Sequence, residues 1–174
     1  KDLNHDGKLD DNDKTFIGNA FPDLMVGINA RLAWKNIDFA ANFYGTIGND
    51  VYNTTKGRYS GVSGENVYAG TYNASWHGEG TSYDLPRLSY NDANQNWTRV
   101  SSFYVEDGSY LRCKQLQIGY TLPKKWTKKI SLRLSFSAQN PFTITGYSGM
   151  DPEAAALGTE GKVTESGIDW AGYP

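Results

Sequence analysis

The stretch Ile130-Ser131-Leu132-Arg133-Leu134-Ser135-Phe136-Ser137-Ala138-Gln139 alternates strictly between apolar and polar residues. At about 180° per residue, as in a β-strand, the two sets separate completely onto opposite faces. At about 100° per residue, as in an α-helix, the apolar side chains would spread around the whole helix. The stretch therefore predicts a β-strand near residues 130–139 with one apolar and one polar face.

Three more segments carry the same alternation, near residues 24–34, 37–47 and 110–122. The connections alternate between short and long: the turn Lys35-Asn36, a long stretch near 48–108, a short loop at 123–129 and a long stretch at 141–174. Because consecutive strands are antiparallel here, we expect the short connections at one end of the sheet and the long ones at the other. Outer-membrane barrels have this arrangement, with short periplasmic turns and long extracellular loops.

Strand length favours a membrane barrel. Each predicted strand has about 10–13 residues, whereas a membrane-spanning strand needs about 9–11 and soluble strands average about 5–6. Amphipathic rings and lysines, which favour a membrane interface, gather near the short-turn end: Trp34, Tyr120 and Trp126, with Lys124, Lys125, Lys128 and Lys129. We therefore expect an all-β fold in which antiparallel strands form part of a large transmembrane β-barrel. Four strands cannot close a barrel, since the smallest has about eight, so the rest of the wall is expected outside this sequence.

Alternation by itself does not separate this fold from a soluble β-sandwich, because either one pairs an apolar face with a wet one. The alternative interpretation is a secreted calcium-binding β-sandwich that binds glycans. Such a domain would fold and stay soluble without detergent. The two readings differ in what covers the apolar face, which is lipid in a barrel and a second sheet in a sandwich.

Composition excludes some classes of function. The 174 residues contain 17 Lys and Arg against 19 Asp and Glu, a net charge of −2, whereas nucleic-acid binding needs a basic excess. The single cysteine, Cys113, permits no internal disulfide. His5 and His77 have no neighbours in sequence that suggest a nucleophile–base pair. We therefore expect no enzyme activity and no catalytic residues.

The N-terminal residues 1–22 contain a calcium-type loop, Asp2-Leu3-Asn4-His5-Asp6-Gly7-Lys8-Leu9-Asp10-Asp11-Asn12-Asp13. Oxygen ligands recur at the spacing of such loops, and Gly7 stands where the chain must turn sharply. Position 12 is an aspartate instead of the usual bidentate glutamate. The predicted ligands, with the backbone carbonyl of the lysine, are Asp2, Asn4, Asp6, Lys8, Asp10 and Asp13. The alternative is a polar surface turn without metal.

The long 48–108 stretch contains aromatic residues among Asn, Asp, Ser and Gly. Flat rings with amide and carboxylate neighbours suit stacking on sugar rings, and they suit a protein lid equally well. Packing of the loop on itself is the alternative. The candidate ligand or lid contacts are Tyr68, Tyr72, Trp76, Tyr83, Tyr90 and Trp97.

Several further motifs occur in order along the chain. The calcium-type loop is followed by Ile17-Gly18-Asn19 and Pro22-Asp23, and Gly48-Asn49-Asp50 comes after the second strand. Further on stand Val105-Glu106-Asp107-Gly108-Ser109-Tyr110-Leu111-Arg112 and Leu116-Gln117-Ile118-Gly119-Tyr120-Thr121-Leu122-Pro123. The last motifs are Ser137-Ala138-Gln139-Asn140-Pro141-Phe142, Tyr147-Ser148-Gly149-Met150-Asp151-Pro152-Glu153, Gly167-Ile168-Asp169 and Gly172-Tyr173-Pro174. Together they resemble the SusC/RagA family of TonB-dependent outer-membrane transporters.

The resemblance implies a 22-stranded barrel with an internal plug, of which residues 1–174 are a C-terminal portion. It implies TonB-powered import of oligosaccharides or peptides across the outer membrane of Bacteroidetes-type bacteria, with a SusD-like surface lipoprotein closing over the external loops. The plug, the TonB-contacting segment and the final strand are expected outside these residues, so no family substrate residue is carried over to this sequence.

Overall fold

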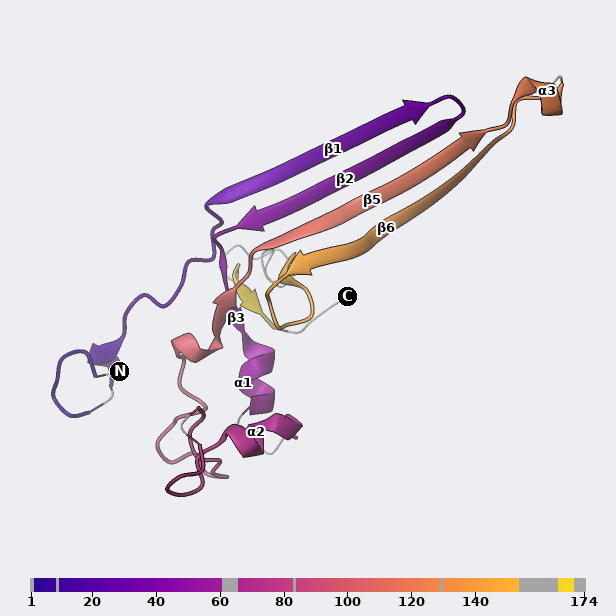
Figure 1. Cartoon of the computed structure of the whole chain (residues 1–174). Coiled ribbons are helices and arrows are strands. Elements are labelled where there is room, and N and C mark those ends of the chain that lie inside the picture. Colours follow the sequence, from indigo (N-terminus) through magenta and orange to yellow (C-terminus); the bar gives the residue numbers. More distant parts are fainter. Residues whose placement is uncertain are drawn as a thin grey trace.

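Four long strands dominate the computed structural model, which describes residues 2–8, 10–60, 66–82, 84–128, 130–153 and 166–170. They form one antiparallel sheet in the order β1-β2-β5-β6 (Figure 1). We call it the long sheet. Its strands are β1 (Leu24–Trp34), β2 (Ile37–Ile47), β5 (Tyr110–Thr121) and β6 (Arg133–Thr145). The expected strand near 24–34 and its neighbour at 37–47 have the predicted bounds.

The fourth strand differs from the prediction, because it begins at Arg133 and continues to Thr145 instead of ending at Gln139. Gln115 pairs with Gln139 and Cys113 pairs with Phe142, so the ladder is interrupted and then resumes. Asn140, with a φ of 47°, stands in this irregularity. Pro141 lies in it too, and a proline is tolerated in a sheet where the ladder needs no N–H from it. The polar Asn-Pro pair therefore marks a bulge and not the end of the strand.

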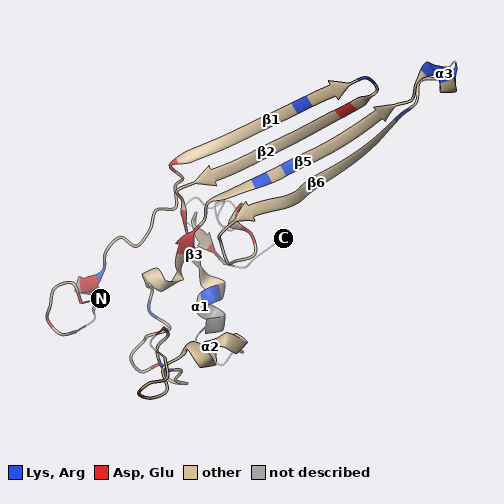
Figure 2. Cartoon of the chain, viewed as in Figure 1, with Lys and Arg blue, Asp and Glu red and all other residues tan. Residues whose placement is uncertain are grey.

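The short connections lie at one end of the long sheet, as expected from the alternation of loop lengths. β1 and β2 join through Lys35, with a φ of 54°, and Asn36. β5 and β6 join through a segment that contains the helix α3 (Lys124–Thr127) at the same end (Figure 1). Lys124 and Lys125 make this end basic (Figure 2).

The register aligns large apolar side chains in rows across the strands, because paired residues of antiparallel strands share a face. The rows, from the short-turn end, are Trp34–Ile37–Tyr120–Leu134, Leu32–Phe39–Ile118–Phe136 and Ala30–Ala41–Leu116–Ala138. Beyond the bulge they continue as Ile28–Phe43–Cys113–Phe142 and Val26–Gly45–Leu111–Ile144. One face of the long sheet is therefore apolar over nearly its whole length.

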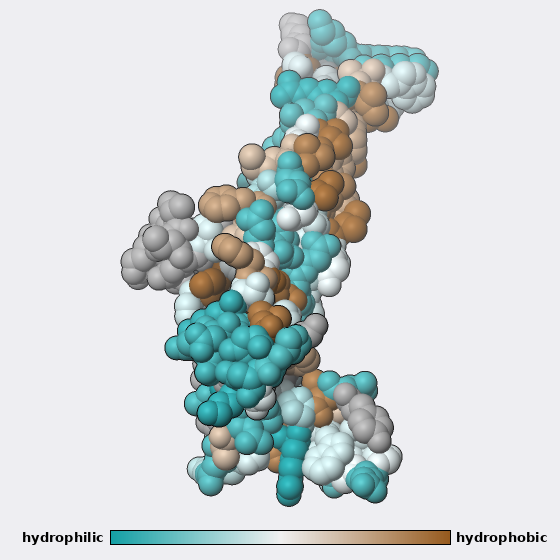
Figure 3. All heavy atoms as spheres, turned by 90° about the vertical axis from the view of Figure 1, so that its left-hand side faces the viewer, coloured by the Kyte–Doolittle hydropathy of each residue, from teal (hydrophilic) through white to brown (hydrophobic). Residues whose placement is uncertain are grey.

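Most of the large side chains on this face stay exposed. Leu32 is 68% and Phe136 66% exposed, and hydrophobic atoms gather along the long sheet (Figure 3). Between Leu24 and Trp34 the face extends about 33 Å along β1, or about 25 Å at a barrel tilt of about 40°, which is the height of the apolar band on outer-membrane barrels. A sandwich would stack a second sheet about 10 Å away. In the described part of the chain, no such sheet covers it.

None of the described helices combines the length and the hydrophobicity that a membrane-crossing helix requires.

At the other end of the long sheet, the predicted 48–108 loop contains regular structure. β3 (Asp50–Asn53) pairs with β4 (Val105–Asp107) and with β7 (Ile168–Asp169) in a small sheet. The helix α1 (Thr54–Ser60) and the 3-10 turn η2 (Ser102–Tyr104) pack beside it. We call β3, β4, β7, α1 and η2, with the neighbouring residues Asn49, Trp97, Tyr147 and Ser148 that hydrogen-bond to this region, the loop assembly. The remaining elements are η1 (Asp11–Asp13) and α2 (Ala69–Ala74).

Candidate functional site: a polar wall and its loops

The second face of the long sheet is polar and carries a row of amides. Asn29 pairs with Asn42, Asn42 with Gln115, and Gln115 with Gln139. The amide nitrogen Nδ2 of Asn42 donates to Oε1 of Gln115 over 3.3 Å. Each amide offers donors and an acceptor, so this row presents a neutral hydrogen-bonding surface across all four strands.

An ion pair crosses the polar face near the short-turn end. Arg133 on β6 donates from Nη2 and Nε to the two carboxylate oxygens of Asp38 on β2, over 2.5 and 3.2 Å. β5 lies between them, at Gly119. A Cβ on Gly119 would overlap Nη2 of Arg133 and Oδ1 of Asp38. Glycine at this position therefore leaves the room that the two side chains need to meet over β5.

A second ionic cluster stands at the long-loop end of the same face. Arg112 of β5 donates from Nε to Oγ1 of Thr143 over 2.8 Å. Its two terminal nitrogens contact Asp151 and Glu153, each over 2.5 Å. Lys114 pairs with Glu153 as well. Only 8% of Arg112 is exposed, so the carboxylates of residues 151 and 153 cover the wall at this point.

Glu106 links three segments of the loop assembly. Its carboxylate accepts hydrogen bonds from the backbone N–H of Ser148 over 3.0 Å and from the hydroxyl of Ser148 over 2.9 Å, and it pairs with Lys56 of α1 over 3.2 Å. Burial raises the pKa of Glu106, but the Ser148 hydrogen bonds and the Lys56 charge outweigh burial and hold the pKa below its ordinary value. The ionised carboxylate therefore stabilises this part of the fold.

Tyrosines complete the interior of the loop assembly. The Tyr147 hydroxyl donates to Oδ2 of Asp169 over 2.6 Å, and both residues are buried. The Tyr104 hydroxyl donates to the carbonyl of Trp97 over 2.8 Å, and burial raises the pKa of Tyr104 to about 12. Val51 is fully buried and lies in one apolar cluster with Tyr147. Residues far apart in sequence thus meet at the end of the long sheet.

The calcium-type loop is closed on itself. The carboxylate of Asp13 accepts the N–H groups of Leu3 and Asp10, over 2.7 and 2.9 Å, and Asp2 accepts those of His5 and Gly7, over 2.7 and 2.9 Å. Gly7 has a φ of 81°, so it makes the expected sharp turn. Asn4, Asp6 and Asp10 accept loop N–H groups in the same way.

A calcium site also needs converging oxygens. Within the described residues, no group of three or more His, Cys, Asp or Glu is placed to hold a metal ion. The oxygen-rich donor set suits a hard cation, but the carboxylates of this structure are turned toward loop amides. The metal ligands therefore stay a prediction from the sequence.

Comparison with known proteins gives one consistent result. The chain is 35% identical over 99% of its length to TonB-dependent receptor P3 of Formosa agariphila, and 25% identical over 99% of its length to TonB-dependent receptor SusC of Bacteroides thetaiotaomicron. A solved structure of the RagAB peptide transporter matches 74% of the chain with a TM-score of 0.63 and 25% identity. The RagAB peptide importer in its closed-closed state matches 89%, with a TM-score of 0.70 and 23% identity. No protein-family model matches the chain.

The chain belongs to the SusC/RagA family of TonB-dependent receptors. It spans 17% of the length of P3 and 16% of that of SusC. As predicted from the motifs, the fold is that of a piece of a transmembrane barrel, and the location is the bacterial outer membrane. The apolar face of the long sheet therefore meets lipid and its polar face lines the lumen. In this SusC/RagA chain the lumen face carries the amide row and both ionic clusters.

The predicted aromatic contacts of this SusC/RagA chain fall into two groups. Tyr90 is 81% exposed. Tyr68, Tyr72 and Trp76 lie on or next to α2 and are exposed, and the Tyr72 ring stacks on His77 at 5.1 Å. Trp97 differs from the prediction, because it is 5% exposed and its Nε1 donates to the carbonyl of Arg87. Its ring fills the interior of the loop and offers no face to a ligand. Tyr83 lies outside the described residues, as does the Gly172-Tyr173-Pro174 motif.

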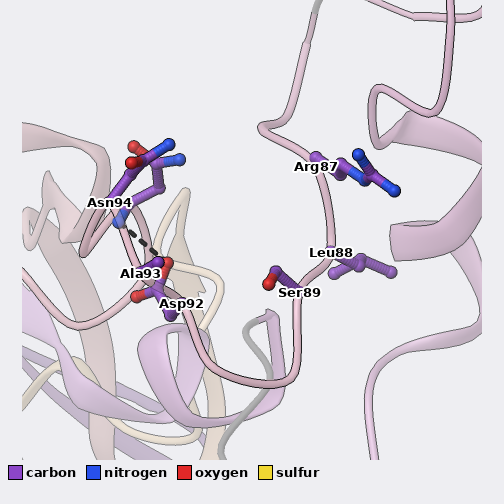
Figure 4. A pocket seen from close by; sticks show the side chains of 7 residues that line it. Arg87, Leu88, Ser89, Asp92, Ala93 and Asn94 are labelled. Carbon is purple, nitrogen blue, oxygen red and sulfur yellow. Dashed lines mark hydrogen bonds between the residues drawn. The ribbon is translucent and has the colours of Figure 1, made fainter.

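A cavity of about 340 Å³ opens in the same loop and was not predicted from the sequence. It is lined by Arg87, Leu88, Ser89, Asp92, Ala93, Asn94 and Asn96. The side chains of Arg87 and Leu88 point away from the opening (Figure 4). Asp92 accepts the N–H groups of Asn96, Trp97 and Thr98, so its carboxylate holds the turn that forms the cavity.

Proposed function

We propose that this chain is a wall segment of a TonB-dependent outer-membrane importer that takes up oligosaccharides or peptides. The exposed apolar face of the long sheet carries this proposal. Its rows of large side chains run across four strands, and soluble monomeric proteins rarely expose a contiguous apolar surface of this extent. The polar face behind it supplies the wet lining that an import channel needs.

The proposed import depends on partners that act on the complete transporter. TonB would supply energy through regions outside these residues, and a SusD-like lipoprotein would cover the external loops. Support comes from the relatives, which are TonB-dependent receptors, and from the structural match to RagAB, which is a peptide importer. The exposed rings of Tyr68, Tyr72, Trp76 and Tyr90 stand beyond the long-loop end, where a lid or cargo would arrive.

The proposed cargo is an oligosaccharide or a peptide, because exposed tyrosine and tryptophan rings can pack against sugars as well as against protein surfaces. The amide row fits both as well, because its donors and acceptors match sugar hydroxyls and peptide groups. Uptake assays with the two cargo classes distinguish them.

We further propose that the N-terminal loop binds Ca²⁺ through Asp2, Asn4, Asp6, Lys8, Asp10 and Asp13. The spacing of its oxygen donors and the turn at Gly7 support a structural ion that pins the loop ahead of β1. The ion would replace the loop amides as partner of the carboxylates.

The test of the main proposal uses the full-length protein in its native membrane. We expect it in the outer-membrane fraction, with a mobility on detergent gels that shifts after boiling, because folded barrels resist the detergent until heated. A soluble product whose mobility is independent of boiling would overturn the proposal and would favour the calcium-binding β-sandwich.

A further inference from the structure

The segment that follows β6 is attached at two separate places. We call residues 146–153 the strap. Near its start, Tyr147 donates to Asp169 and Ser148 donates to Glu106, so this part belongs to the loop assembly. At its end, Asp151 and Glu153 reach the polar face of the long sheet. The strap therefore joins the loops to the lumen wall.

The attachment to the wall is ionic. Arg112 contacts both carboxylates of the strap, and Lys114 adds a second cation on Glu153. The Arg112 guanidinium also lies 5.7 Å from the ring centre of Tyr110, which is 5% exposed. Asp151 also accepts the N–H of Glu153 over 2.9 Å, which fixes the short turn that presents both acids to β5.

Apolar burial at the wall end of the strap is limited to Pro152. Met150, the larger apolar residue there, is 75% exposed. Where the strap leaves β6, nothing lies within 4 Å of the position that a Cβ on Gly146 would take. An attachment made of charge-assisted hydrogen bonds depends on partner geometry, and removal of Arg112 would leave two carboxylates without their guanidinium partner.

We propose that the strap is an ionic latch over the lumen: the Arg112–Asp151–Glu153–Lys114 cluster holds residues 146–153 against the inner wall, and its opening uncovers this part of the barrel mouth. The contacts to Glu106 and Asp169 keep the strap on the loop assembly when the latch opens. Movement of the loops is thereby coupled to exposure of the lumen wall. This inference rests on the proposed transporter, because the wall is complete only there.

A buried reporter on the strap tests the latch. Pro152 is buried between the two acids, so a Pro152→Cys variant of the full-length transporter, with Cys113→Ala to remove the native thiol, reports opening by its reaction with a membrane-impermeant maleimide. Arg112→Gln in this background should raise the labelling rate by about tenfold or more, since it removes hydrogen bonds to two carboxylates. The matched control is Arg133→Gln, which breaks the Arg133–Asp38 pair elsewhere on the same face and should leave the rate unchanged.

The acids of the strap give an independent second variant. Asp151→Asn with Glu153→Gln leaves every strand intact and should raise labelling as much as Arg112→Gln does. Heat-modifiable mobility is measured on each variant, so a defect in the barrel is separated from an open latch. Labelling of both latch variants at the parent rate, in barrels that keep the heat shift, would overturn the latch. Loss of the heat shift in the parent would instead contradict the proposed transporter.

Discussion

The long sheet exposes large apolar side chains, whereas the loop assembly buries polar and aromatic ones. Leu32 and Phe136 are about two-thirds exposed, but Asn49, Asn53 and Asp169 are at most 3% exposed. In a soluble protein this distribution would be inverted. Lipid explains the difference, because it covers the long sheet from outside, while the loop assembly stands in water and must build its own interior.

The two regions also differ in what holds them together. The long sheet is held by backbone ladders between neighbouring strands, which are interrupted at one bulge each in the β2–β5 and β5–β6 pairs. The Asp38–Arg133 ion pair also ties β2 to β6. The loop assembly depends on single contacts between distant residues, such as Tyr147–Asp169 and Glu106–Ser148. In the long sheet, the loss of stability caused by a substitution should therefore depend on how deep the residue lies in the lipid. In the loop assembly, it should depend on which single hydrogen-bond partner is lost.

The largest expected effect comes from a charge placed on the lipid face. Ile28→Arg puts a cation near the middle of the apolar band and should destabilise the folded barrel by about 2–4 kcal/mol. Asn29→Arg, one residue further on the lumen face, is the matched control and should cost far less. Denaturant titration of the full-length transporter in lipid vesicles measures both, and equal losses would contradict the assignment of the two faces.

Next in size is the loss of one hydroxyl in the loop assembly. Tyr147→Phe removes the donor to the buried carboxylate of Asp169 and should destabilise the loop assembly by about 1–3 kcal/mol. The long sheet should keep its heat-modifiable mobility. Protease protection of the loops measures the effect, with Tyr90→Phe as control because Tyr90 is 81% exposed. Unchanged protection in Tyr147→Phe would show that this contact does not hold the loops.

Acid should loosen the loop assembly before the long sheet. The pKa of Glu106 lies below the ordinary value of 4.5, so its contribution to stability is complete above about pH 4.5 and is lost as the pH falls through the lowered pKa. Protease protection of the loops should decline in that acidic range in the parent protein. In Glu106→Gln, the loops should be less protected from protease at neutral pH, and the loss of protection that comes from protonation of Glu106 should be absent. Identical pH profiles of the parent and the variant would contradict the role of Glu106.

The smallest expected effect concerns calcium. Extracellular calcium modules bind with dissociation constants of about 0.1–1 mM, so about 1 mM Ca²⁺ should stabilise the N-terminal loop by roughly 0.4–1.4 kcal/mol. Asp6→Ala should abolish the part of the thermal stabilisation that chelator removes, and Asp11→Ala, outside the predicted ligand set, should preserve it. Stability that responds neither to chelator nor to Asp6→Ala would exclude a metal site.

The sequence by itself determined the strands of the long sheet, because a side-chain period of two with one apolar face is a local property that each segment carries alone. Leu24–Trp34 and Ile37–Ile47 end where their alternation ends. The fourth strand was misjudged at Asn140-Pro141, since only the pairing of Cys113 with Phe142 reveals a bulge there.

The tertiary structure alone decided which residues of the long connections are buried and which residues they contact. It placed Trp97 inside the loop, although its ring looks like its exposed neighbours in sequence. It brought Glu153 to Arg112 across 41 residues and Tyr147 to Asp169 across 22. Such contacts depend on where chain segments arrive in space, and no local period encodes them. Which face a strand residue occupies depends on its neighbours along the chain. The partners of buried charges and hydroxyls are determined only by the tertiary structure, because they come from distant parts of the sequence.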